Sequence, residues 1–226
     1  MTTSSATRAT SRFTTLWGGG LVAVSGLFLV LLGFLWGPFD AVLVTLRSWV
    51  TVVAPILFVG SLLILAFGVR GEAGIMRRSR AGRGAAVAFA TVTFGSWLFS
   101  LVGSNNPPAL PGLPQVTLPI LTNLVLMVIS FGSLLIIAVV VVRAGVVHRV
   151  TGWGLLVVVV LTEGPSLLAF LPWPGLDQAG LTVGFEIARW IYLAGLLLQI
   201  VVGIGIAVTG QATRLRDAAK DFNHRW

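Results

Sequence analysis

A single carboxylate interrupts one of the most apolar stretches of the chain, VVVVLTEGPSLLAF at residues 157–170. This residue, Glu163, lies near the middle of its apolar run, where a charged side chain would cost about 2.5–3.5 kcal/mol inside a membrane. Glu163 is therefore expected to be protonated or to face a partner or water. Such a carboxylate is typical of proton and cation sites. The alternative is a structural carboxyl group hydrogen-bonded to a neighbouring helix.

The residues around Glu163 add further polar groups at the same place. Thr162 and Ser166 lie four residues apart, so a helix would put both hydroxyls beside the carboxylate. Pro165 has no N–H, and the carbonyl of Leu161 therefore loses its helical donor. The segment is predicted to be a local break in the helix that could hold a proton, an ion or a substrate group.

Two uncharged polar side chains, Asn123 and Gln199, also fall within apolar runs. We expect each to form an interhelical hydrogen bond worth about 1 kcal/mol or less. Both are also candidates to line any pathway that passes Glu163.

Two arginines, Arg47 and Arg189, come just before the most apolar residues of their segments. One interpretation is that both side chains snorkel to the lipid headgroups. The other is that they form ion pairs and build an outer vestibule for an anion or a coupled proton. Arg189 would then pair with Glu186, three residues earlier. Arg47 would pair with Asp40 or Asp177 across the bundle.

The composition of the chain indicates which kind of helix contains these residues. The 226-residue chain is 56% hydrophobic and only 10% charged, with a mean hydropathy of +0.98. Soluble domains are about 25% charged, and apolar runs of about 20 residues are typical of membrane-spanning helices. The sequence predicts an all-α bundle of six transmembrane helices at 17–36, 48–69, 85–103, 119–142, 152–172 and 188–209.

Basic residues divide the connections into two classes. Loops 70–84 and 143–151 and both terminal tails carry nearly all the Lys and Arg, whereas the other three connections carry none. Cytoplasmic loops of membrane proteins concentrate these residues, so both termini are expected in the cytoplasm. The expected organisation is a disordered basic tail at 1–16, a membrane domain at 17–209 and a short basic tail at 210–226, in the plasma membrane.

Three predicted outer turns resemble one another: GPFDAVL at 37–43, PGLPQVTL at 111–118 and PGLDQAGL at 174–181. They are compatible with three helical hairpins in series, although Pro and Gly are common in any tight turn. An inverted repeat of three plus three spans fits the same topology.

Missing residue types exclude several classes of protein. The chain has no cysteine, its histidines are His148 and His224 in connecting segments, and its one lysine is Lys220 in the C-terminal tail. These facts exclude thiolate chemistry, intramembrane bis-histidine haem and a retinal Schiff base in the bundle. No phosphate-binding G-x-x-x-x-G-K-[ST] motif is present. We therefore predict no enzymatic activity, no cofactor and no metal centre.

Two functions remain from these observations. The first is a small transporter or channel subunit in which Glu163 binds a proton or cation, acting as a homo-oligomer because one bundle of this size is thin for a full pathway. The second is a non-catalytic accessory or anchoring subunit of a larger membrane complex, with Glu163 paired to a partner's helix. The expected surroundings are the lipid bilayer, and no nucleic-acid partner is expected because no aromatics interleave the basic residues.

Overall fold

The computed structural model describes residues 12–34, 41–70, 72–77, 79–102, 117–168 and 178–223. These residues form helices and no strand, which confirms the predicted all-α class. The helices are α1 (Arg12–Phe34), α2 (Ala41–Phe67), α3 (Arg80–Val102), α4 (Thr117–Ala144), α5 (Arg149–Leu168) and α6 (Gln178–Asn223).

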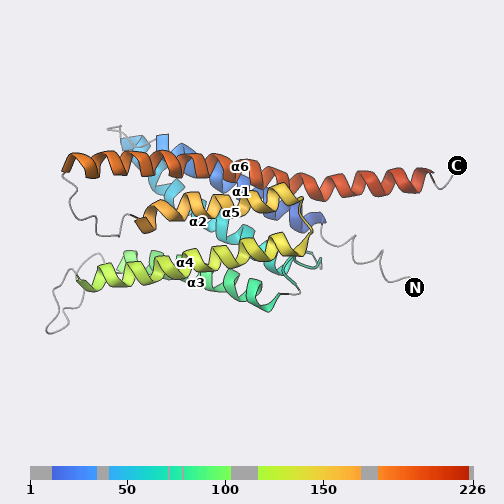
Figure 1. The fold of residues 1–226 in the computed structure, drawn as a ribbon, viewed down its shortest axis with the longest axis horizontal. Helices are drawn as coiled ribbons and strands as arrows, with labels where there is room; N and C mark the ends of the chain where they lie inside the picture. Colours follow the sequence, from blue (N-terminus) through green and yellow to red (C-terminus); the bar gives the residue numbers. More distant parts are fainter. Residues whose placement is uncertain are drawn as a thin grey trace.

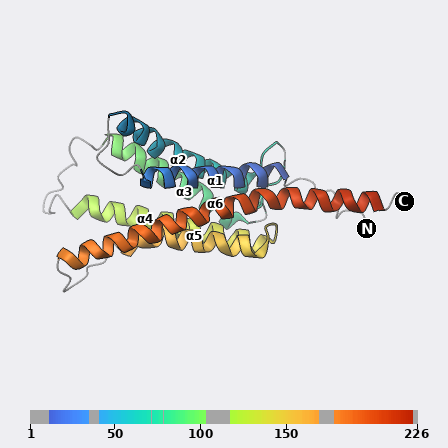
Figure 2. The same ribbon diagram turned by 90° about the horizontal axis from the view of Figure 1, so that it is seen from above.

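The helices form a closed ring in sequence order. Each helix packs against the next one along the chain, and α6 returns to pack against α1. Figures 1 and 2 show them lying roughly along one axis, with successive helices running in opposite directions. The α2–α3 and α4–α5 connections therefore lie at one end, which we name the arginine-rich end after Arg70, Arg77, Arg80, Arg83, Arg143 and Arg149.

Five of the helices are long and apolar enough to cross a membrane. The stretches are Phe13–Gly33, Leu46–Phe67, Thr122–Ala144, Arg149–Leu167 and Val183–Thr209. The described part of α3 does not join this set, and its first turn contains Arg80 and Arg83. Large apolar side chains are exposed along the outside of the ring, among them Leu27, Leu31, Ile56, Val128, Val201 and Ile204. A multi-pass membrane protein follows from these stretches and this surface.

Exposed tryptophans lie toward both ends of the bundle. Trp17 and Trp153 lie toward the arginine-rich end, and Trp49 and Trp190 lie toward the opposite end. All four residues are at least half exposed. Tryptophan is enriched where a protein crosses the membrane–water interface, so this placement agrees with a membrane-spanning bundle.

The helices extend further than the apolar runs predict. α2 begins at Ala41 and α6 at Gln178, so both helices start well before the predicted spans at 48–69 and 188–209. α1 begins at Arg12 and therefore includes residues 12–16, which composition alone assigns to the tail. α6 continues to Asn223 and projects well beyond the other helices (Figure 1). The turn residues 37–40, 111–116 and 174–177 lie outside the described parts of the chain.

Glycines spaced seven residues apart bring α1 close to α6. Gly19, Gly26 and Gly33 all face α6, because a seven-residue spacing returns to the same side of a helix. A Cβ atom added to Gly19 would lie 2.5 Å from the carbonyl oxygen of Gly203, and one added to Gly203 would lie 2.5 Å from the Ala23 nitrogen. The two backbones are therefore in direct contact, as small residues allow between membrane helices.

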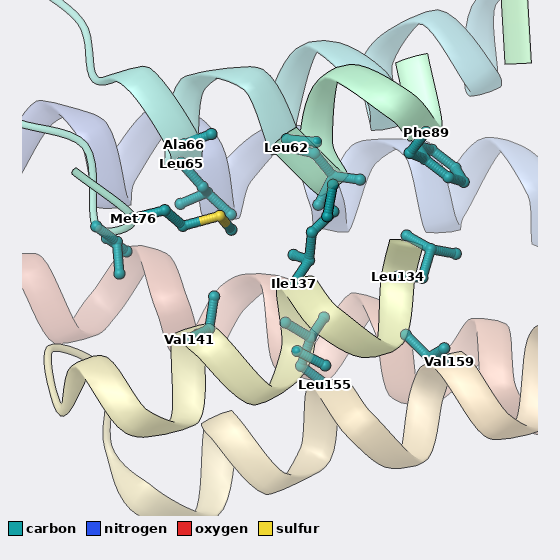
Figure 3. Packing of buried hydrophobic residues seen from close by; sticks show 14 of the residues in the cluster. Leu62, Leu65, Ala66, Met76, Phe89, Leu134, Ile137, Val141, Leu155 and Val159 are labelled. Carbon is teal, nitrogen blue, oxygen red and sulfur yellow. The ribbon is translucent and has the colours of Figure 1, made fainter. Parts of the chain in front are cut away.

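A cluster of buried hydrophobic residues fills the arginine-rich half of the ring (Figure 3). Met76, from the connection between α2 and α3, is fully buried in it between Leu65 of α2 and Val141 of α4. Ile75 is buried in the same cluster, and the Met76 N–H donates to the Leu65 carbonyl at 3.4 Å. The connection therefore folds into the end of the ring and closes it with apolar side chains.

Candidate functional site

The polar segment 161–166 lies in the second half of α5. The helix continues through Pro165 to Leu168, so the segment remains helical and does not form the predicted break. A proline removes one backbone hydrogen bond, and neighbouring helices commonly hold such a helix together in a membrane. The Thr162 hydroxyl donates to the Val158 carbonyl at 2.9 Å and is satisfied within its own helix.

Contacts with α6 show how deep this segment lies. A Cβ atom added to Gly195 would lie 2.9 Å from Leu161 Cβ and 3.0 Å from Thr162 Cγ2, so α5 and α6 pack closely here. Gly195 is near the middle of the apolar stretch Val183–Thr209. The segment is therefore level with the centre of the α6 stretch, while residues 169–172 of the predicted fifth span lie outside the described chain.

Glu163 is partly buried beside α6. Within the described parts of the chain, its carboxylate has no hydrogen bond and no salt bridge. Tyr192, which is the only tyrosine of the chain, lies near it on α6. The carboxylate therefore keeps hydrogen-bonding capacity for a proton, a cation or a donor on another molecule.

A cavity of about 530 Å³ lies beside this segment, between α1, α5 and α6. Its polar lining residues are Ser166, Arg189 and Tyr192, and its remaining walls are largely apolar. Glu163 is three residues before Ser166, one turn deeper on the same side of α5. The described residues that line it are Leu29, Leu32, Gly33, Pro165, Ser166, Phe185, Ala188, Arg189, Tyr192 and Leu193.

Arg189 forms the predicted pair with Glu186, one turn earlier on α6. The Arg189 Nη1 to Glu186 Oε1 distance is 3.8 Å, and the two side chains are 52% and 58% exposed. A salt bridge this long and this exposed contributes little to stability. The guanidinium group therefore keeps most of its donors for other contacts at the edge of the cavity.

Gln199 lies two turns after Tyr192 on α6, where it faces α1. Its side chain is 3% exposed. Its amide donates to the Ser25 hydroxyl at 3.0 Å and to the Val22 carbonyl at 3.3 Å. This is the interhelical hydrogen bond that the sequence predicts. Gln199 does not line the cavity near Glu163.

The other candidate residues are not brought to this cavity. Asn123 is exposed on α4, and Arg47 is partly buried on α2. Neither lines the cavity. Asp40 and Asp177 lie outside the described residues, so a pair with Arg47 stays a prediction. The cavity thus brings together Ser166 and Arg189 from the sequence-based candidates, next to Glu163.

Tyr192 is the residue that sequence reasoning missed. It lies three residues after Arg189, as Glu186 lies three residues before it, so one side of α6 carries all three polar groups. This spacing, and the fact that the chain has no other tyrosine, are the signals that could have identified it.

Chemically, the arrangement can bind a proton or cation at Glu163 and an anion at Arg189. In the part of the chain that the structure describes, no three His, Cys, Asp or Glu side chains are grouped closely enough to hold a metal ion. A smaller cavity of about 250 Å³ lies between α2 and α3, and none of the described residues that line it is charged.

Comparison with protein-family models, with curated proteins and with solved structures finds no match to this chain.

Proposed function

We propose that this chain is a small transporter or channel subunit in which Glu163 takes up a proton or a cation. One observation carries the proposal. A carboxylate level with the middle of the α6 apolar stretch lies one turn below a cavity that contains two hydroxyl groups and a guanidinium group. Ionisable residues at such depth are expensive in a membrane and usually belong to a pathway for ions or protons.

The proposed topology has six spans in the plasma membrane, with α3 as the sixth, and both termini in the cytoplasm. The grouping of the described basic connections at one end supports this orientation, because such loops stay in the cytoplasm. The cavity around Ser166 and Arg189 then opens toward the outer half of the membrane.

Transport would require a conformational change at the arginine-rich end. Met76, Leu62 and Ile137 belong to the hydrophobic cluster that fills this half of the ring. The arrangement therefore has an accessible outer cavity and a closed inner half. In this proposal the α2–α3 connection would move to release a bound ion, or the pathway would run between copies in a homo-oligomer.

An accessory or anchoring subunit is the second candidate. It is favoured by the same hydrophobic cluster, because the described residues form no continuous polar path past Met76. In such a subunit Glu163 would hydrogen-bond to a helix of a partner membrane protein.

Proton flux into proteoliposomes separates the two candidates. Purified protein is reconstituted with a pH-sensitive dye inside, and a potassium diffusion potential drives uptake. For a transporter or channel, we expect flux in the wild type, a loss of about ten-fold or more in Glu163→Gln, and unchanged flux in Asp217→Asn. The control removes one acid from α6 beyond its apolar stretch. Equal flux in wild type and Glu163→Gln would refute the role of Glu163.

The accessory function is tested on the same membranes by native mass spectrometry. A stoichiometric partner that Glu163→Gln releases, combined with no flux from the isolated chain, would support an accessory subunit. A homo-oligomer that conducts protons would count against it.

A further inference from the structure

We propose that the cavity between α1, α5 and α6 is a binding site for an anionic phospholipid. The lipid phosphate would bind Arg189, and one acyl chain would lie along the apolar wall. The inference rests on the proposed function for its membrane setting, but it requires no transport and no role for Glu163.

The shape and lining of the cavity favour a hydrocarbon chain. Its volume of about 530 Å³ falls in the usual range of ligand pockets, about 300–1,000 Å³. Leu29 and Leu32 of α1 line it together with Phe185 and Leu193 of α6, and among the described residues Arg189 is the charged residue of the lining. An acyl chain would be favourably packed against such a wall.

The position of the cavity gives a membrane lipid direct access. Phe185 and Arg189 both line it and both lie within the apolar stretch Val183–Thr209 of α6. Phe185 is 61% exposed, so the cavity opens at the lipid-facing surface of that stretch. A chain from the surrounding bilayer can therefore enter sideways without passing through water.

The positive charge of Arg189 favours a lipid with an anionic headgroup. Arg189 is six residues from Gly195, or about 9 Å along the helix, whereas a hydrocarbon half-layer is about 15 Å thick. Its guanidinium group therefore lies close enough to the headgroups to reach a phosphate by snorkelling. Guanidinium and phosphate form paired, charge-assisted hydrogen bonds, which a loose 3.8 Å contact with Glu186 does not replace.

Two hydroxyl groups line the cavity below Arg189. Ser166 and Tyr192 line the same cavity as Arg189, and Tyr192 lies one turn deeper than Arg189 on α6. Tyr192 lies about 4.5 Å along the helix from the level of Gly195, so its hydroxyl meets a bound lipid well below the phosphate. Arg189 thus lies nearer to the headgroups, and the two hydroxyls lie deeper in the same cavity.

Native mass spectrometry of the full-length protein tests this site. The protein is released from mixed vesicles of dioleoylphosphatidylglycerol and dioleoylphosphatidylcholine, which differ in headgroup charge but not in their chains. We expect the wild type to retain phosphatidylglycerol with a preference of about five-fold, since one basic residue near a membrane surface contributes about 1 kcal/mol. Arg189→Gln should reduce this preference to about one, and Arg189→Lys should keep most of it.

Further variants show whether the lipid preference arises at this cavity. Arg143→Gln, which removes an exposed arginine from the arginine-rich end, should leave the preference unchanged. Ala188→Phe should fill the cavity and reduce retention of both lipids. Because Arg189 is half exposed, its variants should fold even if Ala188→Phe does not.

Three outcomes would overturn the inference: an unchanged preference in Arg189→Gln, an equal loss in Arg143→Gln, or displacement of the lipid by millimolar inorganic phosphate. The last result would identify a site for a free anion. Glu163→Gln should retain the lipid as the wild type does, so a failure of the proton role and a failure of the lipid site give different results.

Discussion

The Glu72 carboxylate accepts two hydrogen bonds from Thr14, one from its backbone N–H at 2.9 Å and one from its hydroxyl at 3.1 Å. Thr14 lies in the first turn of α1, where backbone N–H groups have no helical partner and a negative charge is favourable. Arg70, from the same connection, lies with its guanidinium carbon 5.4 Å from the centre of the Phe13 ring. These contacts hold the connection that contains Met76 against the start of α1.

Removing this carboxylate should loosen the arginine-rich end. We expect Glu72→Gln to lower the free energy of unfolding by about 1–2 kcal/mol, because it weakens a charge-assisted cap at a helix N-terminus. Thr14→Val should cost less, since only the hydroxyl bond is lost. Thermal unfolding in detergent, followed by circular dichroism, measures both. Glu186→Gln is the control, and a loss of stability there as large as in Glu72→Gln would contradict the role of the cap.

The close glycine contacts between α1 and α6 can be tested with two matched substitutions at neighbouring positions. Gly19→Ala should destabilise the fold by about 1–3 kcal/mol, because its Cβ would meet the backbone of α6 at 2.5 Å. Gly20→Ala should be neutral or slightly stabilising, since a Cβ there meets nothing within 4 Å and alanine favours helix. The two unfolding curves should therefore shift in different ways, and equal shifts would show that the close approach is not formed.

The buried amide of Gln199 should contribute modestly to the same contact. Gln199→Leu removes its hydrogen bonds to Ser25 and to the Val22 carbonyl, and the expected loss is about 1 kcal/mol or less. A double-mutant cycle with Ser25→Ala isolates the pairwise energy between the two side chains. Strict additivity in that cycle would show that the two side chains do not interact.

Because the chain has no cysteine, each introduced cysteine reports on one position alone. In intact cells, Gly184→Cys should react with a membrane-impermeant maleimide, because Gly184 is exposed at the proposed outer end of the α6 apolar stretch. Arg77→Cys, which replaces an exposed residue of the arginine-rich end, should react only after the cells are opened. Met76→Cys should stay protected in both conditions because Met76 is fully buried. Labelling of Arg77→Cys in intact cells would reverse the proposed topology.

Apolar runs predict most of the architecture here, because a segment that crosses a bilayer forms a long helix regardless of which helices pack against it. The helix ends are less predictable. α1 begins at Arg12 although residues 12–16 are not strongly apolar, and what fixes this start is Glu72, a residue 58 positions away from Thr14. Composition cannot show a cap that comes from a different part of the chain.

The candidate site was predicted in part. Glu163, Ser166 and Arg189 are conspicuous in sequence because charged or polar groups are rare in apolar runs, and the structure places Ser166 and Arg189 in one cavity. The predicted helix break is absent, because α5 continues through Pro165. Tyr192 was missed because a tyrosine in an apolar run carries no charge, and its place beside Glu163 depends on how α5 and α6 are aligned.

The α1–α6 contact also has a consequence for how the protein is made. Ser25 and its partner Gln199 are 174 residues apart, and synthesis at 5–20 residues per second needs about 10–30 seconds to cover that distance. Throughout that interval the glycine face of α1 has no α6 backbone to meet, and the ring cannot close. Until α6 has been made, the helices therefore form an incomplete ring. During this time lipid or the insertion machinery must keep α1 from packing against other helices.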